Sequence, residues 1–244
     1  MCENCRTNSL LSFAPSRRAA LLFAASAIGL SLATAAGAKE AKKPPKPENV
    51  VSPDAALERL EEGNERYVEG VARRHDFRHE REALAGGQNP YAAILSCADS
   101  RIAPEYAFDS GRGDLFVCRV AGNFANDDVI ASLEYAVAVL ATPLILVLGH
   151  DACGAIDATM KSLKDNSTLP GHLPSLVTAL APAVKAASGR AGDPLAGAIR
   201  QNVIDNVAKL KSAAPVLNAA VEQNKLRVVG GIYRLNSGKV ELIG

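Results

Sequence analysis

The stretch YAAILSCADSR, residues 91–101, places a polar motif directly after an apolar run. A second stretch, LILVLGHDACG at residues 144–154, has the same form. Short apolar runs of this kind are typical of buried strands. In open parallel α/β sheets, ligands bind in the crevice beyond the carboxyl ends of the strands. The two motifs are therefore predicted to meet in one such crevice.

The residues of the two motifs favour a metal site. Cys97, His150 and Cys153 form a Cys₂His set, a known pattern for catalytic zinc with one coordination position left open. Asp99 and Arg101 alternate with Cys97, so the three side chains can converge at a strand end, where an arginine fork can hold a carboxylate through two parallel hydrogen bonds. So held, Asp99 would turn away from the metal. Released, it could become a fourth ligand and close the site.

Alternating strand and helix patterns predict an α/β fold with a central, mostly parallel sheet flanked by helices. The last strand is expected to be antiparallel at the sheet edge, because it follows a turn at residues 236–238. The expected strands are 91–96, 115–120, 144–148, 226–233 and 239–243. The expected helices begin at Ser52-Pro53 and at Gly154, and also cover about 129–140, 169–187, 193–210 and 215–224.

The N-terminus, residues 1–38, has the pattern of an export signal. Paired arginines at 17–18 precede an alanine- and leucine-rich run, which ends in the small residues Ala36-Gly37-Ala38. The paired arginines indicate the twin-arginine route, and hence an exported, periplasmic protein. An uncleaved membrane anchor is the alternative, but the run is mostly alanine and only weakly apolar. We therefore expect no stable membrane span after cleavage.

The rest of the chain divides into a tether and one domain. Residues 39–51 are rich in proline and lysine and are expected to form an extended tether. Residues 52–244 are long enough for a single domain with a sizeable core. The formal net charge of the whole chain is +1, which gives no electrostatic reason to expect nucleic acid as a partner.

Other candidate residues have simpler interpretations. Cys118 lies in a strand pattern and is predicted to be a small buried hydrophobe. His75 and His79 have helical spacing, but a complete ligand set exists elsewhere, so neither is predicted to bind metal. His172 is interpreted as a solvated loop histidine, and Asp151 as a solvated residue between two ligands.

The two motifs together resemble the signature of the β-class carbonic anhydrases, Cys-x-Asp-x-Arg followed by His-x-x-Cys. The segment RVAGN at 119–123 looks like the family's third signature, and the resemblance runs from about Pro53 to the C-terminus. It implies the β-carbonic anhydrase fold, one Zn²⁺ per chain, and a homodimer or tetramer. Many relatives have a glutamine near position 76, where this chain has Asp76.

The activity that the resemblance implies is the reversible hydration of carbon dioxide to bicarbonate and a proton. Zinc-bound hydroxide would attack carbon dioxide, and the catalytic pair Asp99 and Arg101 would orient it. The candidates to line a small apolar substrate pocket are Val120, Ala121, Gly122 and Asn123.

Two alternatives remain open from the sequence. Relatives with this fold hydrolyse carbon disulfide or carbonyl sulfide, which also requires zinc hydroxide and a narrow pocket. A non-catalytic zinc or thiol protein is a different class, but structural zinc sites usually draw on four cysteine or histidine ligands, and only three credible ligands are present.

Overall fold

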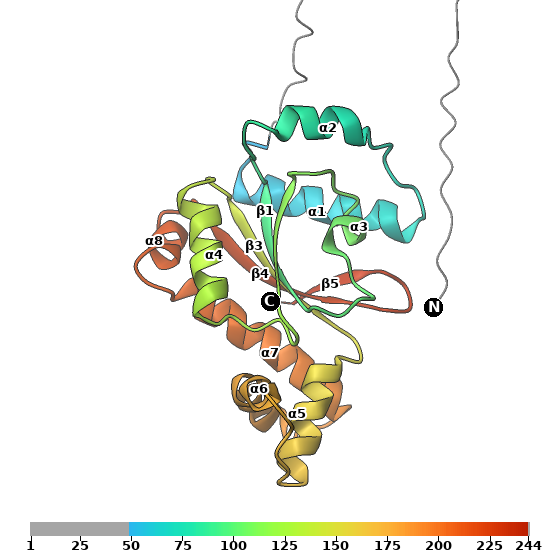
Figure 1. The fold of residues 1–244 in the computed structure, drawn as a ribbon, viewed down its shortest axis with the longest axis vertical. Helices are drawn as coiled ribbons and strands as arrows, with labels where there is room; N and C mark the ends of the chain where they lie inside the picture. The colour runs from blue at the N-terminus through green and yellow to red at the C-terminus, as the bar shows by residue number, and fades with distance from the viewer. Residues whose placement is uncertain (1–48, 244) are drawn as a thin grey trace, which may run out of the picture. The chain divides into compact units, whose positions relative to one another are not determined.

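The computed structural model describes residues 49–243, which contain a five-stranded sheet of order β2-β1-β3-β4-β5 (Figure 1). Four strands are mutually parallel, namely β1 (Ala92–Ser96), β2 (Leu115–Arg119), β3 (Leu144–His150) and β4 (Arg227–Tyr233). The short β5 (Val240–Ile243) pairs antiparallel with β4 at the edge. The predicted fold class, including its antiparallel edge strand, is confirmed.

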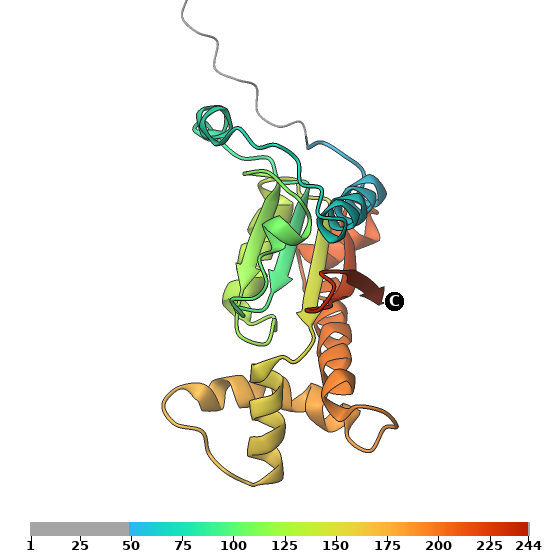
Figure 2. The same ribbon diagram turned by 90° about the vertical axis from the view of Figure 1, so that its right-hand side faces the viewer.

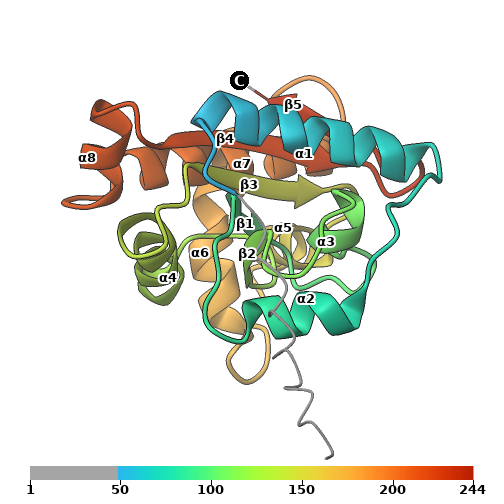
Figure 3. The same cartoon turned by 90° about the horizontal axis from the view of Figure 1, so that it is seen from above.

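The central strands are apolar on both faces because helices cover both. Every residue of β1 and β3 is buried, as expected for central parallel strands. Ile94 and Leu146 contribute to one hydrophobic cluster with the helix α1 (Pro53–Val68), which lies alongside β3 (Figure 3). Leu95 and Val147 alternate to the opposite face.

The helices on the opposite face are α4 (Asp127–Ala138), α7 (Pro194–Lys211) and α8 (Leu217–Glu222). Two more helices, α5 (Gly154–Lys164) and α6 (Leu173–Ala187), lie beyond the carboxyl ends of the parallel strands (Figure 2). Helices α5 and α6 thus cover the end of the sheet where both motifs lie.

Local capping explains where several helices begin. The side chain of Ser52 accepts a hydrogen bond from the backbone N–H of Ala55 at 3.2 Å, and Pro53 occupies the first turn of α1. Asp193 caps α7 in the same way, followed by Pro194. Both starts were predicted from these residues. Two short helices were not predicted, α2 (Phe77–Leu84) and α3 (Pro104–Ala107).

The predicted signal at 1–38 and most of the predicted tether lie outside the described residues. Asn49, near the end of that tether, is buried, and its Nδ2 donates to Asp114 Oδ1 at 3.0 Å. Between residues 49 and 243, no helix combines the length and the apolar character needed to cross a membrane.

Candidate metal centre

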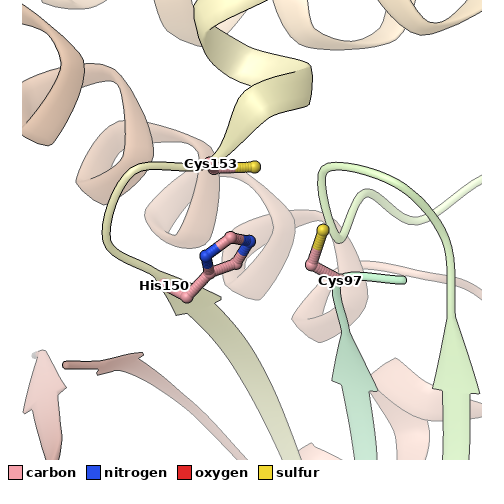
Figure 4. A group of neighbouring side chains, drawn as sticks. All are labelled: Cys97, His150 and Cys153. Atoms are coloured by element: carbon pink, nitrogen blue, oxygen red, sulfur yellow. The ribbon is translucent and has the colours of Figure 1, made fainter. Parts of the chain in front are cut away.

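The three predicted ligands meet beyond the carboxyl ends of β1 and β3 (Figure 4). Cys97 directly follows β1, His150 is the last residue of β3, and Cys153 is the N-cap of α5. The two Sγ atoms and a ring nitrogen of His150 all lie within 4.8 Å of one another, and all three residues are buried. In the described part of the chain, this is the one group of three or more such side chains that could hold a metal ion.

Strand pairing sets this convergence. β1 and β3 are parallel neighbours with Ser96, the last residue of β1, beside Leu148, so β3 runs two residues further and ends at His150. Gly149 allows α7 to pack closely here, because a Cβ at this position would lie 2.7 Å from Cγ2 of Val203. The strand end and the helix behind it therefore fix the backbone that carries His150.

The ring of His150 is oriented for metal binding. Its Nδ1 is 2.8 Å from the backbone oxygen of Asp151, to which it donates in the tautomer that leaves Nε2 unprotonated. Nε2 is buried and has no hydrogen-bond partner. A buried, unpaired nitrogen facing two thiols fits a metal ion, which would supply the missing partner.

The two thiols interact strongly. The hydrogen bond with Cys153 outweighs burial and lowers the pKa of Cys97 to about 4. The same contact, together with burial, raises the pKa of the Cys153 thiol. Burial would lower the pKa of His150, but the nearby Cys97 outweighs it and raises that pKa. Without metal the cysteine pair therefore keeps one proton, which a divalent cation would displace because metal ligands bind deprotonated.

Asp99 is held away from the ligands by Arg101. Nε of Arg101 donates to Oδ1 of Asp99 at 2.9 Å and Nη2 donates to Oδ2 at 2.7 Å. These bonds lower the pKa of Asp99 well below its usual range. Oδ2 also lies 3.9 Å from Nε2 of His150, so the carboxylate borders the ligand cluster. The predicted arginine fork is therefore present.

Arg119 has a positioning role that was not predicted from the sequence, although it belongs to the third signature segment. Its Nε donates to the backbone oxygen of Cys97 at 2.9 Å, and its Nη2 donates to the backbone oxygen of Asp99 at 2.7 Å. Arg119 thus holds the backbone of the first motif from the neighbouring strand β2.

The predicted pocket segment 120–123 lies against the metal ligands. The backbone N–H of Gly122 donates to Sγ of Cys97 at 3.3 Å, and Gly122 has φ +88°. Val120 and Ala121 are partly buried, whereas Asn123 is 1% exposed and its Nδ2 has no partner. This segment therefore touches the centre through a backbone N–H.

Two asparagines of α7 hold this segment, and the sequence analysis missed both. Nδ2 of Asn202 donates to the backbone oxygen of Gly122 at 2.9 Å, and Oδ1 of Asn206 accepts from the N–H of Ala125 at 2.7 Å. Asn206 also donates to Oδ1 of Asn202 at 3.0 Å. The sequence pattern could have indicated them, because both asparagines lie on the apolar, buried face of the helix beside Val203, where a polar side chain needs a hydrogen-bond partner.

The remaining candidates lie outside the cluster. His75 contacts Glu80, and His79 contacts Asp76, which caps α2. His172 is exposed before α6, and Cys118 is half-buried in β2.

Asp151, interpreted from the sequence as a solvated residue, is partly exposed and is also paired. Its side chain is 35% exposed and forms an ion pair with Arg234, Oδ1 to Nη1, at 2.6 Å. The pairing was not visible in sequence because Arg234 follows a distant strand.

Comparison with known proteins identifies the family. A family model described as carbonic anhydrase matches residues 92–240. Carbonic anhydrase 2 of Mycobacterium tuberculosis is 38% identical over 192 residues, covering 78% of this chain and 93% of that protein. The carbonic anhydrase of Mycolicibacterium smegmatis is 38% identical over 196 residues, covering 78% and 93%. The chain therefore belongs to the carbonic anhydrase family.

Solved structures assign the class. The β-carbonic anhydrase CcaA matches with a TM-score of 0.60 and 29% identity, over 77% of this chain and 95% of that one. A tetrameric β-carbonic anhydrase from Sordaria macrospora shares the fold, with a TM-score of 0.62 and 24% identity over 70% and 88% of the two chains. The protein is a β-class carbonic anhydrase, as the two motifs indicated.

Proposed function

We propose that Cys97, His150 and Cys153 bind one zinc ion per chain, and that the protein thereby catalyses the reversible hydration of carbon dioxide to bicarbonate and a proton. The observation that carries the proposal is the unpaired, buried Nε2 of His150 facing two thiols. Two thiolates and one imidazole suit zinc and leave one coordination position open. Zinc bound there supplies a Lewis acid that makes water acidic enough to act as a nucleophile near neutral pH.

Asp99 and Arg101 orient the reacting groups. Arg101 donates its backbone N–H and Nε to Oδ1 and its Nη2 to Oδ2, so a further acceptor site remains on Oδ2, the oxygen 3.9 Å from Nε2 of His150. That site can accept a hydrogen bond from the attacking water and so fix its orientation, while Asp99 stays ionised. With Arg101 in place Asp99 is not a ligand, whereas its release would let Asp99 become a fourth ligand and close the site.

The segment from Val120 to Asn123 forms the side of the site that receives substrate. Carbon dioxide is small, linear and nonpolar, which suits the apolar Val120 and Ala121. Nδ2 of Asn123 is a buried donor without a partner, and it is therefore available to an oxygen of substrate or product.

The assembly and location follow from separate arguments. The tetrameric relative from Sordaria macrospora supports a homodimer or a multiple of it for this chain. The arginine pair and the small residues within 1–38 support export to the periplasm through a twin-arginine signal.

The test combines metal analysis with substrate comparison. Purified protein is expected to contain one zinc per chain and to hydrate carbon dioxide faster than it hydrolyses carbonyl sulfide or carbon disulfide, measured from about pH 6.5 to 9. Asp99→Asn should abolish turnover and leave zinc bound. Full activity without zinc, or in Asp99→Asn, would refute the proposal, and preference for a sulfur substrate would reassign the reaction.

A further inference from the structure

Arg234 links the metal loop to the C-terminal hairpin. It follows Tyr233, the residue paired with His150 across β3 and β4. Its Nη1 donates to Oδ1 of Asp151 at 2.6 Å, while Nε donates to Oε2 of Glu241 in β5 at 2.9 Å. The two carboxylates bind different nitrogens of the guanidinium, so Arg234 ties the metal loop to β5 at the edge of the sheet.

Asp151 is the residue that orients His150. Its backbone oxygen is 2.8 Å from Nδ1 of His150, and its backbone N–H donates to the oxygen of Tyr233 at 3.2 Å. With the side chain bound by Arg234, Asp151 is held through its carbonyl, its N–H and its carboxylate. The carbonyl that fixes the tautomer and ring angle of His150 therefore belongs to a residue that Arg234 restrains.

We propose that Arg234 is a positioning residue for the metal centre, acting through Asp151 on His150. This role rests on the proposed function, because it requires that Nε2 of His150 binds the metal. Groups that orient a ligating histidine typically change metal affinity or activity by about 10–100-fold when removed. Arg234 also pairs the carboxylate of Asp151, which would otherwise be an unpaired anion beside two metal-binding thiolates.

The decisive measurement is the rate at which zinc leaves the full-length holoenzyme in excess chelator. Arg234→Ala should release zinc about 10-fold faster than the unmodified protein. The matched control is Arg227→Ala, which removes an exposed arginine at the start of β4 whose Nη1 pairs with Asp54 at 2.6 Å. Arg227 lies at the opposite end of the strand, seven residues and about 23 Å from Arg234 at 3.3 Å per residue. That control should retain zinc normally.

Cobalt substitution gives a second readout, because the visible spectrum of Co²⁺ reports ligand geometry. Arg234→Ala should alter the spectrum and Arg227→Ala should not. A double-mutant cycle tests the route: in an Asp151→Ala background, Arg234→Ala should cause no further acceleration of zinc release.

The outcomes separate this inference from the proposed function. The role is supported if Arg234→Ala as a single substitution accelerates zinc release and alters the spectrum. It is supported further if adding Arg234→Ala to Asp151→Ala changes neither measurement. Zinc release equal to that of Arg227→Ala overturns it, and so does an effect that persists undiminished in the Asp151→Ala background. If the unmodified protein binds no zinc, the proposed function itself fails.

Discussion

Arg101 binds both carboxylate oxygens of Asp99, with Nε 2.9 Å from Oδ1 and Nη2 2.7 Å from Oδ2. The same Nη2 donates to the backbone oxygen of Ala152 at 3.3 Å. One side chain therefore orients the carboxylate and joins the first motif to the second. The direction in which Asp99 presents its free lone pair depends on Arg101.

Arg101→Met should lower the rate of carbon dioxide hydration by about 100-fold, because a misplaced catalytic group costs that much. Zinc content should stay near one per chain, since Cys97, His150 and Cys153 are unchanged. Rates and metal content are measured on the same preparation. Arg200→Met, at an exposed position of α7, is the control and should keep full activity. Loss of zinc in Arg101→Met would contradict an orienting role.

Replacement of single cysteines should distinguish ligands from Cys118. Cys97→Ser and Cys153→Ser should each weaken zinc binding by more than about 100-fold. Losses up to that size are typical when a residue that hydrogen-bonds to a ligand is removed, and these two are ligands themselves. Cys118→Ser should keep zinc, because burial in β2 raises the pKa of this thiol and it lies outside the cluster. Metal content after dialysis is the measurement. Zinc loss from Cys118→Ser would require a different ligand set.

The ligands could be predicted because local sequence determines their positions. Apolar runs at 91–95 and 144–148 are long enough to be central strands, and a parallel sheet brings their carboxyl ends together. Asp99 and Arg101 are two residues apart, so their pairing is also local. The three ligands and this pair could therefore be predicted from the sequence alone.

The residues that support the ligands could not be predicted from the sequence in the same way. Asn202 binds Gly122 across 80 positions, and Arg234 binds Asp151 across 83. Their partners are a backbone carbonyl and a carboxylate whose environment depends on the tertiary fold, and no local pattern encodes such pairs. The helix α2 was missed because it is only eight residues long, most of them polar, and none of its residues is buried.

Gly122→Ala should both lower the free energy of unfolding and accelerate zinc release from the metal centre. Alanine is strained at φ +88°, and its Cβ would lie 2.8 Å from Cδ1 of the fully buried Leu180. We expect a loss of about 1–3 kcal/mol in the free energy of unfolding of the metal-free chain, measured in urea. Zinc release should also accelerate, because Gly122 donates to Sγ of Cys97.

The control for Gly122 is Gly171→Ala. Gly171 has φ +61°, but nothing lies within 4 Å of a Cβ there, so the cost is backbone strain alone, about 1 kcal/mol. Zinc release should be unchanged. Equal zinc release from the two variants would contradict the expectation that strain at Gly122 moves its N–H away from Sγ of Cys97.

Asp109 should make the fold sensitive to acid. Burial opposes its ionisation, but Nε of Arg66 donates to Oδ2 at 2.7 Å and the N–H of Arg73 donates to Oδ1 at 2.9 Å. The net effect is a pKa of Asp109 below its usual range. An unfolded aspartate titrates near pH 3.9, so this stabilisation is complete above that pH. It is lost as the pH falls through the lower pKa of the folded state.

Arg66→Met should therefore cost about 1.5–3 kcal/mol at pH 5 to 7, the typical value of a hydrogen bond to a charged group. The difference from the unmodified protein should shrink below about pH 4, because Asp109 is protonated first in the variant and then, at its lower folded-state pKa, in the unmodified protein. Urea unfolding of the metal-free chains excludes acid release of zinc as the cause. Arg78→Met, which breaks the exposed pair with Glu82, should cost less than about 1 kcal/mol at every pH. A difference that stays constant down to about pH 3 would mean that Asp109 remains ionised, or that Arg66 stabilises the fold by packing rather than by charge.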